Sequence, residues 1–105
     1  MTELDYLMQA IQDVGFAIAI HSWRDTAMRE MVYEVKDTAG RKSWIKVTDE
    51  MLARAVDPQA EVHRSVRVLL AQYFVSIKQV QAYNACLLLA DARMELEALK
   101  SGARV

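Results

Sequence analysis

The sequence predicts one α+β domain over residues 1–105, in which an N-terminal helix and a three-stranded antiparallel meander precede a short helix and a long helical C-terminal half. Two changes in the spacing of apolar residues predict this order. Apolar residues recur every three or four positions near the N-terminus, alternate with polar residues over residues 16–47, and return to helical spacing after Pro58. The length of 105 residues is typical of one domain.

The N-terminal helix is predicted from its two ends and from one apolar face. Thr2 suits the N-cap, and Gly15 lies where such a helix would end. After Gly15 the spacing changes, because Phe16, Ile18 and Ile20 alternate with smaller or polar residues, which predicts the first strand. The apolar positions of the helix are Leu4, Leu7, Met8, Ile11 and Val14.

The second and third strands are predicted as a hairpin. Gly40 suits the left-handed position that closes a three-residue loop with a bulge. This turn places Tyr33 opposite Ile45 and Glu34 opposite Trp44. One face of the hairpin is then apolar, with Met31, Tyr33, Val35, Ile45 and Val47, and the other carries Val32, Glu34, Lys36, Lys42, Trp44 and Lys46.

The C-terminal half is predicted to be helical. Thr48 begins a short helix, and Asp57 with Pro58 suits the start of a longer one. An unbroken helix from Pro58 to Lys100 would be roughly 65 Å long, whereas a compact domain of this size has a radius of gyration of about 13 Å. We therefore expect either a second copy packed along it or a helical hairpin broken near residues 75–76, where Ser76 and Gln79 have capping-box spacing.

The charge and the N-terminus predict a cytoplasmic protein. Thirteen basic and fourteen acidic residues leave a net charge of −1, so no general field attracts nucleic acid or an anionic membrane. The N-terminus lacks the basic start of a secretory signal. The uncharged apolar stretch from Val14 to Ile20 is far shorter than the ~20 residues of a membrane span.

The sequence predicts no enzyme, no metal and no cofactor. Neither His21 nor His63 has a second histidine or a cysteine at metal-ligand spacing. Cys86, the only cysteine, cannot form an internal disulfide, and its apolar neighbours predict a buried core residue rather than a nucleophile. The three glycines are too far apart for a phosphate-binding loop.

The segment from Val62 to Ala90 contains no acidic residue and is apolar around more than one helical face. Two interpretations are open: a central helix packed under the sheet, or the interface of a homodimer. The interface would consist of Val66, Leu69, Leu70, Tyr73, Phe74, Ile77, Val80 and Leu87.

The polar face of the sheet is the predicted partner-binding surface. If the first strand joins with Ile18 and Ile20 inward, His21 and Trp23 share this face. Tryptophans among mixed charges are typical of protein interfaces. The sequence thus favours a non-enzymatic adaptor or an inhibitor of a larger assembly, unless the C-terminal helices cover this face. The predicted contacts are Trp23, Val32, Glu34, Trp44 and Lys46.

A DNA-binding transcriptional regulator is the alternative function, centred on residues 66–84. Residues 70–80, LAQYFVSIKQV, resemble a helix-turn-helix, but the turn glycine is missing and the spacing from Ala71 to Val80 is one residue short. The other interpretation is that Ser76 caps or kinks a helix. The resemblance implies that bases or phosphates would contact Arg64, Arg67, Lys78, Gln79, Gln81 and Asn84.

Overall fold

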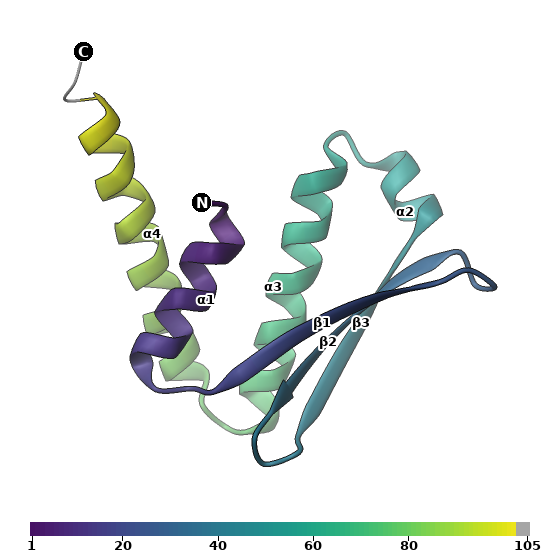
Figure 1. The fold of residues 1–105 in the computed structure, drawn as a ribbon, viewed down its shortest axis with the longest axis horizontal. Coiled ribbons are helices and arrows are strands. Elements are labelled where there is room, and N and C mark those ends of the chain that lie inside the picture. The colour runs from purple at the N-terminus through teal and green to yellow at the C-terminus, as the bar shows by residue number, and fades with distance from the viewer. Residues whose placement is uncertain (103–105) are drawn as a thin grey trace. The chain divides into compact units, whose positions relative to one another are not determined.

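The computed structural model describes residues 1–102 and has the predicted α+β order of elements (Figure 1). These residues form two compact units. The first, here called the helical unit, combines residues 1–17 with residues 79–102. The second, the sheet unit, is Ile18–Lys78.

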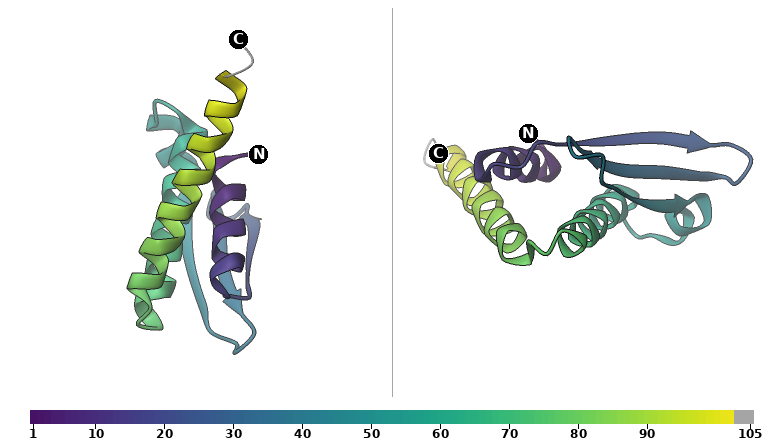
Figure 2. Two further views of the ribbon diagram at one scale, coloured as in Figure 1. Left: turned by 90° about the vertical axis from the view of Figure 1, so that its left-hand side faces the viewer. Right: turned by 90° about the horizontal axis from the view of Figure 1, so that it is seen from below.

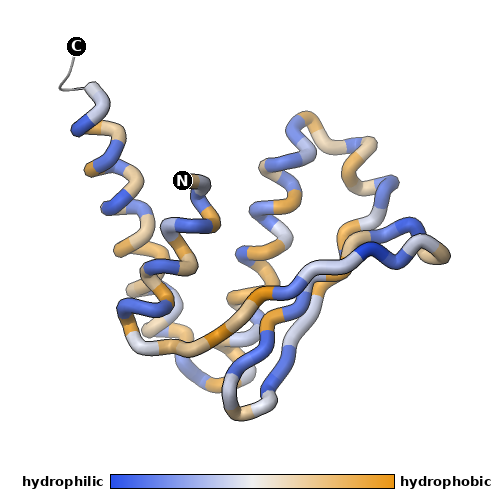
Figure 3. Tube along the Cα trace, in the orientation of Figure 1, coloured by the Kyte–Doolittle hydropathy of each residue, from blue (hydrophilic) through white to orange (hydrophobic). Residues whose placement is uncertain are grey.

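The helical unit is a pair of helices from the two ends of the chain. Helix α1 (Glu3–Val14) packs against α4 (Val80–Gly102), and the two run in opposite directions (Figure 2). In Figure 3 apolar residues are frequent in the first half of α4, and hydrophilic residues become more frequent toward its C-terminal end. The buried residues of the pair are Leu7, Ala10, Ile11, Tyr83, Cys86 and Ala90.

Both predicted ends of α1 are confirmed. The Thr2 hydroxyl accepts from the Asp5 N–H at 3.3 Å, and the Asp5 carboxylate accepts from the Thr2 N–H at 2.9 Å, which completes a capping box. Gly15 adopts a left-handed conformation with φ +111°. This conformation costs glycine little because it has no Cβ.

The sheet unit contains an antiparallel meander in the order β1–β2–β3. Its strands are β1 (Ile18–Asp25), β2 (Glu30–Asp37) and β3 (Lys42–Thr48). The predicted hairpin register is confirmed, because Tyr33 lies opposite Ile45 and Glu34 opposite Trp44. Gly40 has φ +82°, and its N–H donates to the Asp37 carbonyl at 3.2 Å.

Two helices complete the sheet unit: α2 (Asp49–Arg54) and α3 (Pro58–Ser76). The predicted caps are confirmed, because Thr48 Oγ1 accepts from the Met51 N–H at 3.1 Å and Asp57 Oδ1 accepts from the Gln59 N–H at 3.1 Å. Helix α3 lies along one face of the sheet and contacts β3 and β2. The core between them contains Val35 and Val47 from the strands.

The helical C-terminal half is broken between Ser76 and Val80, close to the predicted position. The predicted cause is wrong, because Ser76 does not cap α4. Its hydroxyl donates to the Tyr73 carbonyl at 2.6 Å, within α3. Lys78 ends the helix with a left-handed φ of +60°, and its N–H donates to the Val75 carbonyl at 3.0 Å.

Candidate interaction site

The two faces of the sheet are distinguished by a hydrogen bond to α3. The Tyr73 hydroxyl donates to Asp37 at 2.7 Å, so the side of β2 that carries Asp37 and Val35 faces this helix. The opposite side, here called the outer face, carries the even-numbered residues of β2. The strand register places Trp23 and Lys46 on either side of Val32, and His21 and Trp44 on either side of Glu34. All five predicted partner-binding residues therefore share one face.

The two tryptophans are the large apolar side chains that the outer face exposes. Trp23 is 46% exposed and Trp44 is 57% exposed. Val32 differs from its prediction as a surface contact, because it is only 6% exposed. It lies on the central strand, where side chains from both flanking strands cover it. The tryptophans lie on the edge strands, so each has a neighbouring strand on one side only and stays partly exposed on the other.

Lys46 connects Trp44 to a buried carboxylate on the outer face. Its Nζ lies 5.4 Å from the centroid of the Trp44 ring and 3.2 Å from Glu30 Oε1. Glu30 is only 5% exposed, so the ion pair compensates a charge that would otherwise be costly to bury. Glu30 was not among the predicted site residues. The register could have indicated it, because it lies on the same face as Val32 and diagonal to Lys46.

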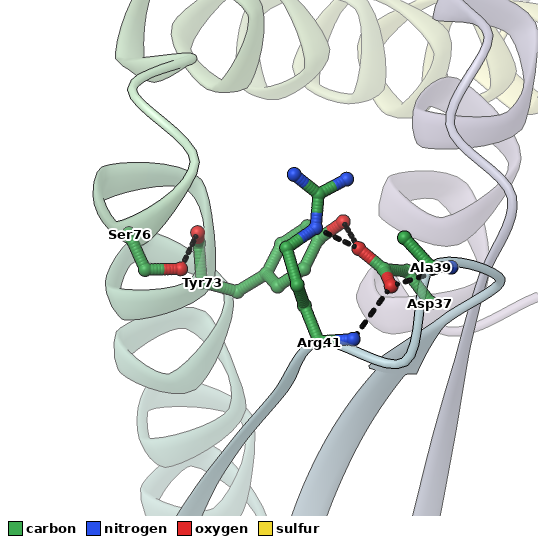
Figure 4. Close-up of polar contacts among 5 residues, drawn as sticks. All are labelled: Asp37, Ala39, Arg41, Tyr73 and Ser76. Carbon is green, nitrogen blue, oxygen red and sulfur yellow. Dashed lines mark hydrogen bonds and ion pairs between the residues drawn. The ribbon is translucent and has the colours of Figure 1, made fainter.

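On the opposite face, Asp37 anchors the β2–β3 loop to α3 (Figure 4). Its carboxylate accepts from Tyr73 Oη and Arg41 Nε, both at 2.7 Å. It also accepts from the N–H groups of Ala39 and Arg41, both at 2.9 Å. The bond from Tyr73 is the largest cause that lowers the Asp37 pKa to about 2.

The same contact fixes Tyr73 in its neutral form. Burial, and then the bond to the Asp37 carboxylate, raises the Tyr73 pKa to about 12. Near neutral pH Asp37 is therefore charged and Tyr73 is protonated. The arrangement stabilises the fold and provides neither a general acid nor a general base near pH 7.

The other candidate groups for chemistry lie apart from these contacts. Cys86 is buried as predicted, and burial raises the pKa of its thiol. His21 is exposed on the outer face, and His63 is half-buried on α3. Among residues 1–102, no group of three or more His, Cys, Asp or Glu side chains could hold a metal ion. None of the helices in this range has the length and hydropathy to cross a membrane.

Most of the predicted dimer interface belongs to the core of a single chain. Ile77 and Leu87 are half-buried, and Val80 is exposed. The other five residues are at most 1% exposed, so a second copy is not required to cover them. Their helical spacing matches the interpretation of a helix packed under a sheet. These five are Val66, Leu69, Leu70, Tyr73 and Phe74.

The residues of the helix-turn-helix alternative are divided between the two units. Arg64, Arg67 and Lys78 belong to the sheet unit, and Gln79, Gln81 and Asn84 belong to the helical unit. Arg67 is half-buried, and the other five are exposed. Lys78, which lies between α3 and α4, has a left-handed φ of +60°.

The chain matches no family model, and comparisons with curated proteins and with solved structures find no significant similarity.

Proposed function

We propose that the protein is a small non-enzymatic interaction module, an adaptor or an inhibitor of a larger assembly, that binds a partner protein through the outer face of its sheet. The observation that supports this proposal is the pair of half-exposed tryptophans on one face, at 46% and 57% exposure. Tryptophan is enriched among the residues that contribute most to binding energy at protein interfaces.

The surroundings of the tryptophans resemble the composition of an interface. Val32 forms an apolar floor beside Trp23, and Glu34 with Lys46 supplies polar groups around it. Interfaces commonly combine an apolar centre with a polar rim. The Lys46 ammonium lies 5.4 Å from the centroid of the Trp44 ring. A cation at this distance favours one position of the ring, which would reduce the entropy lost when a partner immobilises it.

The first experiment is capture of partners by the tagged full chain from its native lysate, with and without nuclease. The proposal predicts a stoichiometric protein that remains bound after nuclease treatment. A nuclease-sensitive eluate would contradict it and would favour the DNA-binding alternative.

Binding of the captured partner should depend on both tryptophans. Combining Trp23→Ala with Trp44→Ala removes two interface anchors, each worth about 2 kcal/mol or more, so the affinity should fall by roughly 700-fold. The measurement is titration calorimetry, with circular dichroism to verify the fold. The matched control combines Leu88→Ala with Leu99→Ala, two exposed apolar residues of α4. Equal affinity of the tryptophan variant and the control would exclude the outer face.

A further inference from the structure

Strand β1 lies at the edge of the sheet, and it is both long and exposed to solvent. It has eight residues, against a mean strand length of about 5–6, and none of them is buried. Helix α3 packs on β2 and β3, and the strand order leaves β1 at the edge of the sheet (Figure 2). One row of backbone N–H and C=O groups of β1 therefore has no partner strand in the sheet unit.

The two edges of the sheet differ in how they are protected against pairing. The β3 edge carries Lys42 and Lys46, and lysines on an edge strand discourage the addition of another strand. Residues 18–23 of β1 contain no lysine, arginine, carboxylate or proline. The pairing with β2 runs one-to-one over all eight residues, so no bulge twists this edge away. The β1 edge thus has the properties of a strand that can accept a neighbour.

We propose that the neighbour is the β1 strand of a second copy, paired antiparallel to form a continuous six-stranded sheet. The strand is electrostatically compatible with itself. Its charged residues, Arg24 and Asp25, lie at one end, and antiparallel pairing places the two sets at opposite ends of the interface. Arg24 is already neutralised within the chain by a bidentate bond to Asp49, at 2.6 and 3.0 Å.

The geometry of antiparallel pairing restricts the register. Directly opposite residues point to the same face, so a two-fold pair of identical strands must place a residue opposite its own counterpart. The two registers that use most of β1 place either His21 or Ser22 at the two-fold axis. Either register extends the outer face across both copies, with two tryptophans from each. This inference rests on β1 and not on the proposed function.

The oligomeric state of the full chain tests the proposal. Light scattering after size-exclusion chromatography should give twice the chain mass at high micromolar concentration. Combining His21→Asp with Ser22→Asp places like charges at the axis in either register and should give the single-chain mass. Both residues are exposed, so the circular dichroism spectrum should not change. A matched control, Gln81→Glu with Asn84→Asp, adds the same charge on α4 and should remain dimeric.

Cross-linking provides a second readout that does not depend on a destabilising change. Opposite residues of antiparallel strands have Cβ atoms about 4.5–5.5 Å apart, close to disulfide distance. Under mild oxidation His21→Cys or Ser22→Cys should give a covalent dimer, and Lys42→Cys on the β3 edge should not. A monomeric wild-type chain, a double-aspartate variant that remains dimeric, or cross-linking no stronger than that of Lys42→Cys would overturn the proposal.

Discussion

At neutral pH the Asp37 carboxylate holds the β2–β3 loop and α3 together, through bonds from Tyr73, Arg41 and Ala39. Its pKa in the folded chain is about 2, below the ordinary value of 3.8. A lowered pKa means that the unfolded chain binds the proton more tightly, so this contribution to stability is complete only well above pH 3.8. We expect it to be lost as the pH falls from about 4 to about 2, as measured by urea unfolding across this range.

Substitutions of Asp37 and of Tyr73 separate the contribution of Asp37 to acid unfolding from that of the other carboxylates. Asp37→Asn should lower the stability at pH 7 and flatten its dependence on pH between 4 and 2. Tyr73→Phe removes the largest cause of the pKa shift, so the folded pKa of Asp37 should rise toward 3.8. The loss of stability on acidification should then be smaller and should end at a higher pH. An Asp37→Asn variant with the pH dependence of the wild type would show that other carboxylates control the acid transition.

At the scale of elements, the end of α3 is strained at Lys78. A non-glycine residue with φ near +60° costs on the order of 1–3 kcal/mol. Glycine relieves this strain but loses more backbone entropy on folding. Lys78→Gly should therefore raise the free energy of unfolding by about 0.5–1 kcal/mol, measured by urea denaturation.

A matched variant separates backbone strain from charge. Lys78→Ala removes the same ammonium group but keeps the Cβ atom, so we expect little change in stability. If the alanine variant gained as much stability as the glycine variant, the charge of Lys78 and not its backbone conformation would be responsible.

The elements that the sequence predicts best are those with local signals. The hairpin register follows from Gly40 and from the alternation on either side of it, and the helix starts follow from Thr2, Thr48 and Asp57. These signals act within a few residues, so a single sequence contains them in full.

Features that depend on distant residues were less predictable. The bond between Asp37 and Tyr73 joins residues 36 positions apart, and no local pattern indicates it. The burial of Val32 on the outer face also depends on the side chains of two neighbouring strands. Helical spacing identified Val66 to Phe74 as an apolar set, but the spacing is the same for a helix that packs on its own sheet and for one that packs on a second copy. The part of the outer face on β2 and β3 could be predicted because one hairpin register fixes it, whereas the place of Trp23 also depends on how β1 pairs with β2.

At the scale of the whole molecule, the sequence predicts one domain. The way in which the chain passes through the two units gives a reason to expect that they unfold together. The helical unit joins the two ends of the chain, so α1 and α4 are connected only through the sheet unit, Ile18–Lys78. When the sheet unit unfolds, it becomes a long flexible loop, and its entropy opposes contact between the two helices. A pair of helices alone also buries too little apolar surface for a stable fold. We therefore expect both units to unfold in one transition.

Each unit contains its own probe of unfolding. Cys86 is fully buried in the helical unit, and burial raises the pKa of its thiol, so a thiol reagent should react slowly until that unit opens. Both tryptophans lie in the sheet unit, and their fluorescence should change when the contacts with Val32 and Lys46 are lost. In urea the two signals should have the same midpoint, which is a standard test of two-state unfolding. Labelling of Cys86 at a urea concentration where tryptophan fluorescence is still native would show that α1 and α4 separate first, and that the chain is not one cooperative domain.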